Sequence, residues 1–194
     1  LDPETPHGQS IFDHCVYVIA GDGCLQEGVS AEASSLAGTQ KLGNLIVLWD
    51  DNRISIEGDT DIAFSEDVLK RYESYGWHIQ RVDWLNEDGS YVEDVQGLDK
   101  ALDAARDNTD QPSIIALQTI IGWPTPEKSN TGGIHGAKLG EDALRGLKLA
   151  LGADPDAHFA VDEEAVAHSR KQFAQRAQVL RDHWNQRFEQ WRKA

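Results

Sequence analysis

The chain has 194 residues, and its 33 acidic side chains outnumber its 18 Lys and Arg side chains, which gives a net charge of −15 at pH 7. This length allows one domain of ordinary size. The negative charge argues against nonspecific binding to nucleic acid or to an anionic membrane, because both carry the same sign of charge. The two cysteines form no CxxC motif, and no apolar run approaches the ~20 residues that span a bilayer. Together with the lack of a recognisable signal peptide, these features predict a cytoplasmic protein.

Four runs of β-branched and aliphatic residues predict strands, at residues 15–20, 45–50, 77–82 and 113–119. Helical patterns lie between the first three strands and their successors. Such an alternation of strand and helix is typical of βαβ units. We therefore expect an α/β fold in which helices cover both faces of a parallel sheet.

The first helix is predicted to begin near Glu27. Its apolar stripe is expected to consist of Val29, Ala33, Leu36 and Ala37. The second helix is predicted to start at Ser65, which two acids follow, and to stop at Gly76. Its stripe is expected to consist of Val68, Leu69, Tyr72 and Tyr75. A third helix is predicted over about residues 91–108.

Residues 122–140 are rich in Gly, Pro, Ser, Thr and Asn, and predict a long ordered loop. Beyond Asp162, apolar residues recur at helical spacing and predict one long helix. These residues are Val166, Phe173, Ala177, Leu180, Trp184, Phe188 and Trp191. We expect the stripe to pack on the domain or on a partner, and a coiled coil is the alternative.

Two polar clusters follow the first two predicted strands: Gly21-Asp22-Gly23 and Asp51-Asn52. Because the carboxyl ends of parallel strands converge on one crevice, Asp22 and Asn52 can supply two oxygen ligands to one hard cation. The glycines beside Asp22 permit a sharp turn and a close approach of backbone N–H groups to a phosphate. The pattern therefore predicts a magnesium site that carries a diphosphate.

Several longer segments contain or follow these clusters in a fixed order. They are residues 21–28 (GDGCLQEG), 30–38 (SAEASSLAG), 41–45 (KLGNL), 50–58 (DDNRISIEG), 71–77 (RYESYGW) and 112–122 (PSIIALQTIIG), followed by His135-Gly136-Ala137 and Leu139. In this order they resemble the thiamine diphosphate motif of the transketolase family, in its actinobacterial form. The resemblance spans nearly the whole chain and implies the thiamine diphosphate-binding fold.

Transketolases place part of their cofactor domain before the first strand seen here, and two further domains after the last helix. The resemblance therefore implies an internal fragment of the cofactor-binding domain, or one component of a split enzyme. Residues 1–162 are expected to form part of that domain. Residues 163–194 are expected to form a helix that leads to an interdomain linker.

Carried onto this chain, the resemblance implies a metal site and a diphosphate site. Asp22 and Asn52 are expected to donate side-chain oxygens to Mg²⁺ or Ca²⁺, and Ile54 its backbone carbonyl. Gly21 and Gly23 are expected to lie at the cofactor, with the N–H of Gly23 directed to the diphosphate. Thiamine diphosphate is thus the implied cofactor.

The resemblance also implies roles for residues outside the metal site. His135 is expected to reach the diphosphate or the substrate and to help proton transfer. Glu27, and less strongly Glu32, is expected at a dimer interface, in acidic contacts that link two active sites. Ile121 is expected to pack beside the thiazolium ring. Asp51 replaces an Asn of many relatives, and an added carboxylate would attract the cation but repel the diphosphate.

The activity that the resemblance implies is the transfer of a two-carbon ketol unit between phosphorylated sugars, in the pentose phosphate pathway. The resemblance implies that the protein forms a homodimer and that a pyrimidine-binding domain, from the same or the partner chain, is its further partner. Because that domain supplies the other half of the active centre, the chain alone is expected to be inactive.

Other functions remain open at this point. A related thiamine diphosphate enzyme, such as the first component of a 2-oxo acid dehydrogenase or deoxyxylulose phosphate synthase, shares Gly-Asp-Gly. A dinucleotide-binding module would need a third glycine where this chain has Gln26. A noncatalytic interaction domain would use the long helix and its tryptophans.

Overall fold

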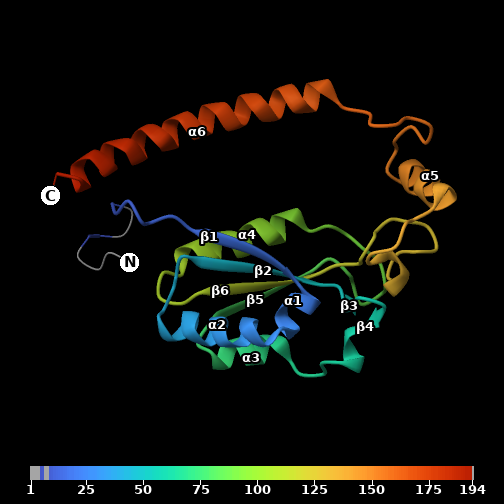
Figure 1. Ribbon diagram of the computed structural model, residues 1–194, viewed down its shortest axis with the longest axis horizontal. Helices are drawn as coiled ribbons and strands as arrows, with labels where there is room; N and C mark the ends of the chain where they lie inside the picture. The colour runs from blue at the N-terminus through green and yellow to red at the C-terminus, as the bar shows by residue number, and fades with distance from the viewer. Residues whose placement is uncertain (1–4, 7–8, 194) are drawn as a thin grey trace. The chain divides into compact units, whose positions relative to one another are not determined.

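The computed structural model describes residues 5–6 and 9–193 of the chain (Figure 1). The chain divides into two compact units. One consists of residues 15–155, and the other of residues 1–14 together with residues 156–194. The domain boundary predicted after residue 162 stays a prediction.

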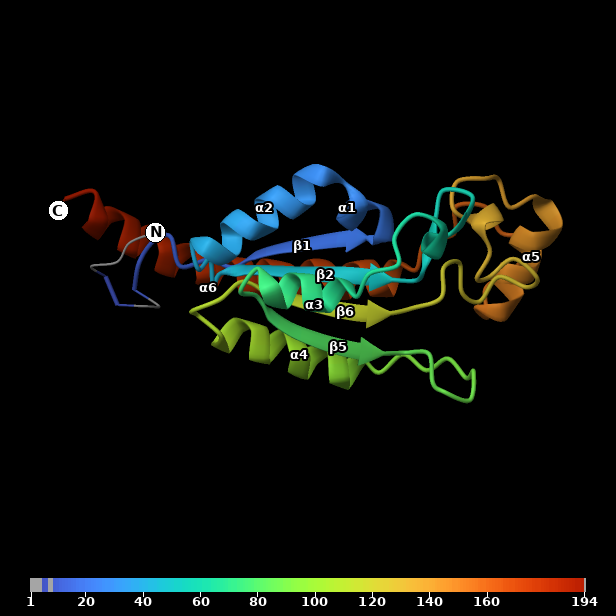
Figure 2. The same cartoon turned by 90° about the horizontal axis from the view of Figure 1, so that it is seen from below.

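A four-stranded parallel sheet forms the centre of the unit of residues 15–155. Its strands lie in the order β1 (Val16–Gly21), β2 (Leu45–Asp51), β6 (Ser113–Gln118) and β5 (His78–Asp83). Each strand begins within one residue of its predicted start. Figure 2 shows the four arrows side by side, all pointing to the same edge of the sheet. The carboxyl ends of β1 and β2 therefore meet, with Gly21 level with Asp50.

Helices cover both faces of this sheet, as predicted (Figure 1). On one face lie α1 (Asp22–Gln26), α2 (Gly28–Thr39) and α3 (Val68–Ser74), and on the other lies α4 (Val95–Asp107). Two hydrophobic clusters correspond to the two faces. The first contains Leu25, Ala37, Val47, Trp49, Tyr72, Trp77, Ile114 and Ala116, and the second contains Ile46, Val82, Ala101, Ala105 and Ile115. The fold class is therefore confirmed.

Shorter elements extend the carboxyl edge of the sheet. A small hairpin follows β2 and is formed by β3 (Ile54–Ser55) and β4 (Gly58–Asp59). The 3-10 turn η1 (Thr60–Ile62) comes next, and a second one, η2 (Gly132–Ile134), lies in the long loop after β6. Helix α5 (Glu141–Ala150) ends this part of the chain. The hairpin, the two turns and α5 lie outside the sequence-based predictions.

The apolar stripe predicted for the first helix is correct at Ala37 and wrong at Val29, Ala33 and Leu36. In α2, Val29 and Leu36 are 68% and 60% exposed, whereas Ser34 and Ala37 are buried. The buried face of α2 carries small side chains and lies close to its neighbours: the hydroxyl of Ser34 donates to Tyr72 Oη at 3.1 Å, and a Cβ on Gly38 would overlap the carbonyl of Tyr75. Close approach therefore decides which face of α2 is buried, rather than side-chain hydrophobicity.

Two helix starts also differ from the predictions. The N-cap of α3 is Asp67 and not Ser65, because the Asp67 carboxylate accepts the N–H of Lys70 at 3.1 Å. The stripe of α3 was predicted correctly: Tyr72 is buried, and its partners pack against the same cluster. Helix α4 begins at Val95 instead of residue 91, since Asp94 caps it by accepting the N–H of Gly97 at 2.8 Å.

The second unit contains the long helix α6 (Glu163–Trp191), which the sequence predicts correctly. Its last turns carry the stacked rings of Trp184 and Phe188, with centroids 4.9 Å apart. The indole N–H of Trp184 donates to the carbonyl of Ile11 at 3.2 Å. Earlier in the helix, the stripe residues Phe173 and Leu180 are exposed. Whether a partner or a coiled coil covers that stretch stays a prediction. Among the described residues, no helix is both long and apolar enough to cross a lipid bilayer.

Gly38 offers a test of the close packing between α2 and α3. A Cβ on this residue would overlap the backbone carbonyl of Tyr75, so we expect Gly38→Ala to destabilise the fold by about 1–3 kcal/mol. In the same helix, a Cβ on Gly28 meets nothing within 4 Å, and Gly28→Ala should stabilise by up to about 1 kcal/mol. Urea unfolding followed by tryptophan fluorescence measures both changes, and equal effects would contradict the packing described here.

Candidate functional site

The chain turns from strand to helix at the first polar cluster. Gly21 ends β1 in an extended conformation, with φ −88° and ψ 176°, and Asp22 begins α1. Neither Gly21 nor Gly23 has a positive φ, so the turn itself does not require glycine. At Gly23 the reason is space, because a Cβ there would lie 2.9 Å from the hydroxyl oxygen of Ser55. A Cβ on Gly21 would meet nothing within 4 Å, so the chain is open beside Asp22.

The carboxylate of Asp22 joins the two polar clusters into one site. Its Oδ2 accepts the backbone N–H groups of Asn52 at 3.2 Å and Arg53 at 3.0 Å. Its Oδ1 accepts the indole N–H of Trp49 at 3.1 Å. The residue is only 7% exposed. The convergence of Asp22 with the Asn52 segment, expected from the sequence, is therefore present in the structure.

The amide of Asn52 is fixed by its own contacts. Its Nδ2 donates to Asp50 Oδ2 at 3.0 Å, and its Oδ1 accepts the N–H of Ile54 at 3.0 Å. The hydroxyl of Thr119 donates to the other oxygen of Asp50. The amide oxygen is thus held on the side of Ile54, the third predicted ligand, which begins β3 and is half-buried.

Asp50 and Asp51 point to opposite faces of the sheet, as alternation along β2 requires. Asp51 is buried, and its carboxylate pairs with Arg81 at 3.1 Å. Arg81 lies two strands away, level with the small residue Ala116 of the intervening β6, which leaves room for the arginine to cross. Asp51 is therefore held by a cation of the chain itself.

A cavity of about 350 Å³ lies beside these acids. Its walls include Asp22, Trp49, Asp51 and Arg81, together with side chains of the segment 60–69. Burial raises the pKa of Asp22 from 3.8 to about 6, and the nearby charge of Asp51 adds to this, while the N–H groups of Trp49, Asn52 and Arg53 oppose it. Burial also raises the pKa of Asp51, against the effect of Arg81.

The donor set fits a hard cation better than a transition metal. Among residues 5–6 and 9–193, no three His, Cys, Asp or Glu side chains gather as a metal site. The predicted set has instead one carboxylate, one amide and one carbonyl, the oxygen ligands that Mg²⁺ and Ca²⁺ accept. Asp22 Oδ1 and Asn52 Oδ1 each accept one N–H and have capacity for a further partner. A cation there would also offset the raised pKa of Asp22.

The loop that carries Ile121 and His135 is folded back on itself. A Cβ on Gly122, next to Ile121, would overlap the side chain of Ile134, next to His135. In turn η2, a Cβ on Gly132 would overlap the carbonyl of Glu57 in the β3–β4 turn. His135 is exposed, and in the described part of the chain no hydrogen bond joins its ring to Asp22 or Asn52. The loop thus borders the hairpin that begins with Ile54, and the roles of His135 and Ile121 stay predictions.

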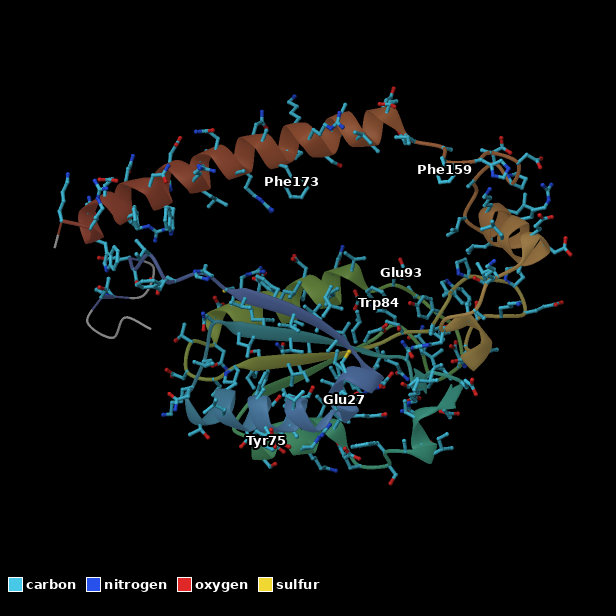
Figure 3. The ribbon with its side chains drawn as sticks, viewed as in Figure 1. Glu27, Tyr75, Trp84, Glu93, Phe159 and Phe173 are labelled. Carbon is cyan, nitrogen blue, oxygen red and sulfur yellow. The ribbon has the colours of Figure 1, made fainter. Side chains whose placement is uncertain are left out.

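Glu27 lies between α1 and α2, on the face of the sheet that α1, α2 and α3 cover (Figure 3). Its backbone carbonyl accepts the N–H of Ser30 at 3.0 Å. The side chains of Glu27 and Glu32 are both exposed. The predicted roles of these two acids, at a dimer interface and in catalysis, stay predictions.

Two residues of the site lie outside the sequence-based predictions. Trp49 donates to the Asp22 carboxylate, and Arg81 neutralises Asp51. For Trp49 the sequence holds one signal, since it lies two positions before Asp51 in a strand and so shares its face. For Arg81 it holds none, because β5 is separated from β2 by β6.

Comparisons with known proteins agree in one family. Residues 2–194 match the family model "Transketolase, thiamine diphosphate binding domain". The transketolase of Mycobacterium leprae is 50% identical over 98% of this chain and 26% of its own length. The crystal structure of a Pichia stipitis transketolase in complex with sedoheptulose-7-phosphate superposes with a TM-score of 0.84, at 43% identity over 95% of this chain and 26% of that chain. Transketolase from Leishmania mexicana gives 0.83 at 36% identity, again over 95% and 26%. The chain thus spans about a quarter of the length of these relatives.

The raised pKa of Asp22 predicts a specific pH dependence. Between its unfolded pKa of 3.8 and its folded pKa of about 6, the folded state binds the proton more tightly, so stability falls as pH rises through this window. Since one pKa unit corresponds to about 1.4 kcal/mol, the full difference is about 3 kcal/mol. We expect the wild type to lose stability relative to Asp22→Asn from pH 4 to pH 6.5, in urea unfolding without divalent metal. A constant difference between the two proteins would contradict the raised pKa.

The ion pair of Asp51 gives a second prediction. Arg81→Gln leaves a buried carboxylate without its cation, and because Arg81 itself is 36% exposed we expect a loss of about 1–3 kcal/mol, below that of a fully buried pair. Lys70→Gln removes the partner of Asp67 in an exposed pair and should change little. Urea unfolding at pH 7.5 measures both variants, and similar stabilities for the two would show that the Arg81 pair is unimportant.

Proposed function

Because the chain belongs to the transketolase family of thiamine diphosphate-binding domains, we propose that it forms the diphosphate- and magnesium-binding half of a transketolase active centre. The observation that carries this proposal is the bridge from Asp22 to the backbone of Asn52 and Arg53. It joins the two halves of the motif at the carboxyl edge of the sheet, where ligands of open α/β sheets bind.

In this proposal the metal lies between the oxygens of Asp22, Asn52 and the carbonyl of Ile54. Gly21 leaves space beside the metal, and the N–H of Gly23, in the first turn of α1, faces the diphosphate. Support comes from the fixed amide of Asn52 and from the buried, hydrogen-bonded carboxylate of Asp22. Water and diphosphate oxygens would supply the remaining oxygen ligands that Mg²⁺ prefers.

When bound, thiamine diphosphate supplies a carbon nucleophile for the transfer of a two-carbon ketol unit. The residues of this chain hold and orient the cofactor. His135 donates a hydrogen bond or moves a proton on the substrate side, and Ile121 packs on the ring of the cofactor. Glu27 acts across a homodimer interface, together with Glu32.

The substrates we propose are phosphorylated sugars of the pentose phosphate pathway. Solved Pichia stipitis transketolases that resemble this chain hold xylulose-5-phosphate or sedoheptulose-7-phosphate, which supports this class. The pyrimidine-binding domain of the same or the partner chain completes the site, so the present chain is inactive alone. We further propose a cytoplasmic enzyme with no nucleic-acid or membrane partner, in keeping with the net charge of −15.

Isothermal titration with thiamine diphosphate and Mg²⁺ tests the metal site. We expect the wild-type chain to bind the cofactor only with metal present, and Asp22→Ala to bind at least about tenfold more weakly, because a ligand is lost. Asp61→Ala is the matched control. It removes a carboxylate from the wall of the cavity that Asp22 also lines, and it should bind as the wild type does. Equal heats from the wild type and Asp22→Ala would overturn the proposal.

The alternative is a related thiamine diphosphate enzyme, such as a 2-oxo acid dehydrogenase component or deoxyxylulose phosphate synthase. The relatives described above are named transketolases, which favours ketol transfer. After reconstitution with the missing domains, activity with xylulose 5-phosphate and ribose 5-phosphate supports that reaction. Conversion of pyruvate instead would support the alternative.

A further inference from the structure

We propose that Trp49 is a positioning residue for the metal-binding carboxylate of Asp22. Its indole N–H fixes the orientation in which Asp22 meets the cation. This inference rests on the proposed function, because it concerns the carboxylate that the proposed site offers to Mg²⁺. Trp49 lies outside the residues that the Gly-Asp-Gly and Asp51-Asn52 clusters identify.

The contacts of Asp22 divide unequally between its two oxygens. Both backbone donors, from Asn52 and Arg53, bind Oδ2. Oδ1 accepts one N–H, from Trp49, at 3.1 Å. With Oδ2 held by the backbone, the rotation of the carboxylate about its Cβ–Cγ bond depends on the partner of Oδ1. An indole nitrogen can only donate a hydrogen bond, so the partner of Trp49 must be an acceptor such as the Asp22 oxygen.

The setting of Trp49 makes this contact rigid. The residue belongs to β2 and is 6% exposed, packed in the cluster between the sheet and helices α1–α3. Its ring therefore cannot follow the carboxylate if the carboxylate moves. Hydrogen bonds from such outer partners orient metal ligands, and their loss typically lowers metal affinity by about 10–100-fold. Trp49 meets this description for one of the three proposed ligands.

A purely structural role is the competing explanation, and the chain offers a matched control for it. Trp77 belongs to the same hydrophobic cluster, is 4% exposed and donates its indole N–H to the carbonyl of Ser34 at 2.8 Å. Its acceptor is a backbone atom of α2 and not Asp22. If Trp49 acts only through packing, Phe at either position has the same effect on metal binding.

The experiment compares Trp49→Phe with Trp77→Phe by calorimetry. Mg²⁺ is titrated at a fixed concentration of thiamine diphosphate, and thiamine diphosphate is then titrated at saturating Mg²⁺. For Trp49→Phe we expect the Kd for Mg²⁺ to rise about tenfold or more, and the Kd for thiamine diphosphate at saturating Mg²⁺ to stay at the wild-type value. For Trp77→Phe both constants should match the wild type.

An unchanged Kd for Mg²⁺ in Trp49→Phe, or equal losses in both variants, overturns the positioning role. Should Phe at position 49 impair folding, benzothienylalanine there retains the ring shape without the N–H and is expected to give the same rise in Kd. A crystal structure of the metal-free Trp49→Phe chain tests the positioning role independently of the proposed metal site. A rotated Asp22 carboxylate supports positioning, and an unmoved one refutes it. Equal heats for wild type and Asp22→Ala refute the metal site instead.

Discussion

One buried carboxylate connects the parts of this site. Asp22 starts the helix after β1, yet its oxygens are held by the chain that follows β2. This contact requires β1 and β2 to be neighbours with Gly21 level with Asp50, which the parallel register supplies. A shift of one residue would turn the side chains of β2 to the other face and separate Asp22 from its donors. The sheet therefore sets the geometry of the site before any ligand binds.

The same arrangement buries two carboxylates, those of Asp22 and Asp51. Burial raises the pKa of both Asp22 and Asp51, but only Asp51 has a close arginine partner, Arg81. Asp22 is held by neutral N–H donors, including that of Trp49. Its ionised form is thus the less compensated of the two, and a cation bound there stabilises the fold by mass action. The same lack of a charged partner favours metal binding at Asp22.

Much of the fold follows from local patterns. The four strands, the helices between them and the long α6 are where the periodicity predicts them. The errors have physical causes. At α3 the cap is Asp67 because its carboxylate reaches the N–H of Lys70, and at α2 small residues are buried because neighbouring segments approach closely. Hydrophobic periodicity describes one helix at a time and does not record the distance to the next.

By itself, the sequence determined the order of strands and helices and the two polar clusters at the strand ends, because side-chain periodicity and glycine-acid motifs are local properties. Only the tertiary structure decided that Trp49 binds Asp22, that Arg81 crosses β6 to reach Asp51, and that Gly122 packs against Ile134. Each of these contacts joins residues that are far apart along the chain. The partners of Trp49 and Arg81 are fixed by the order β1-β2-β6-β5 and its register, which arise from the packing of the whole sheet and its helices.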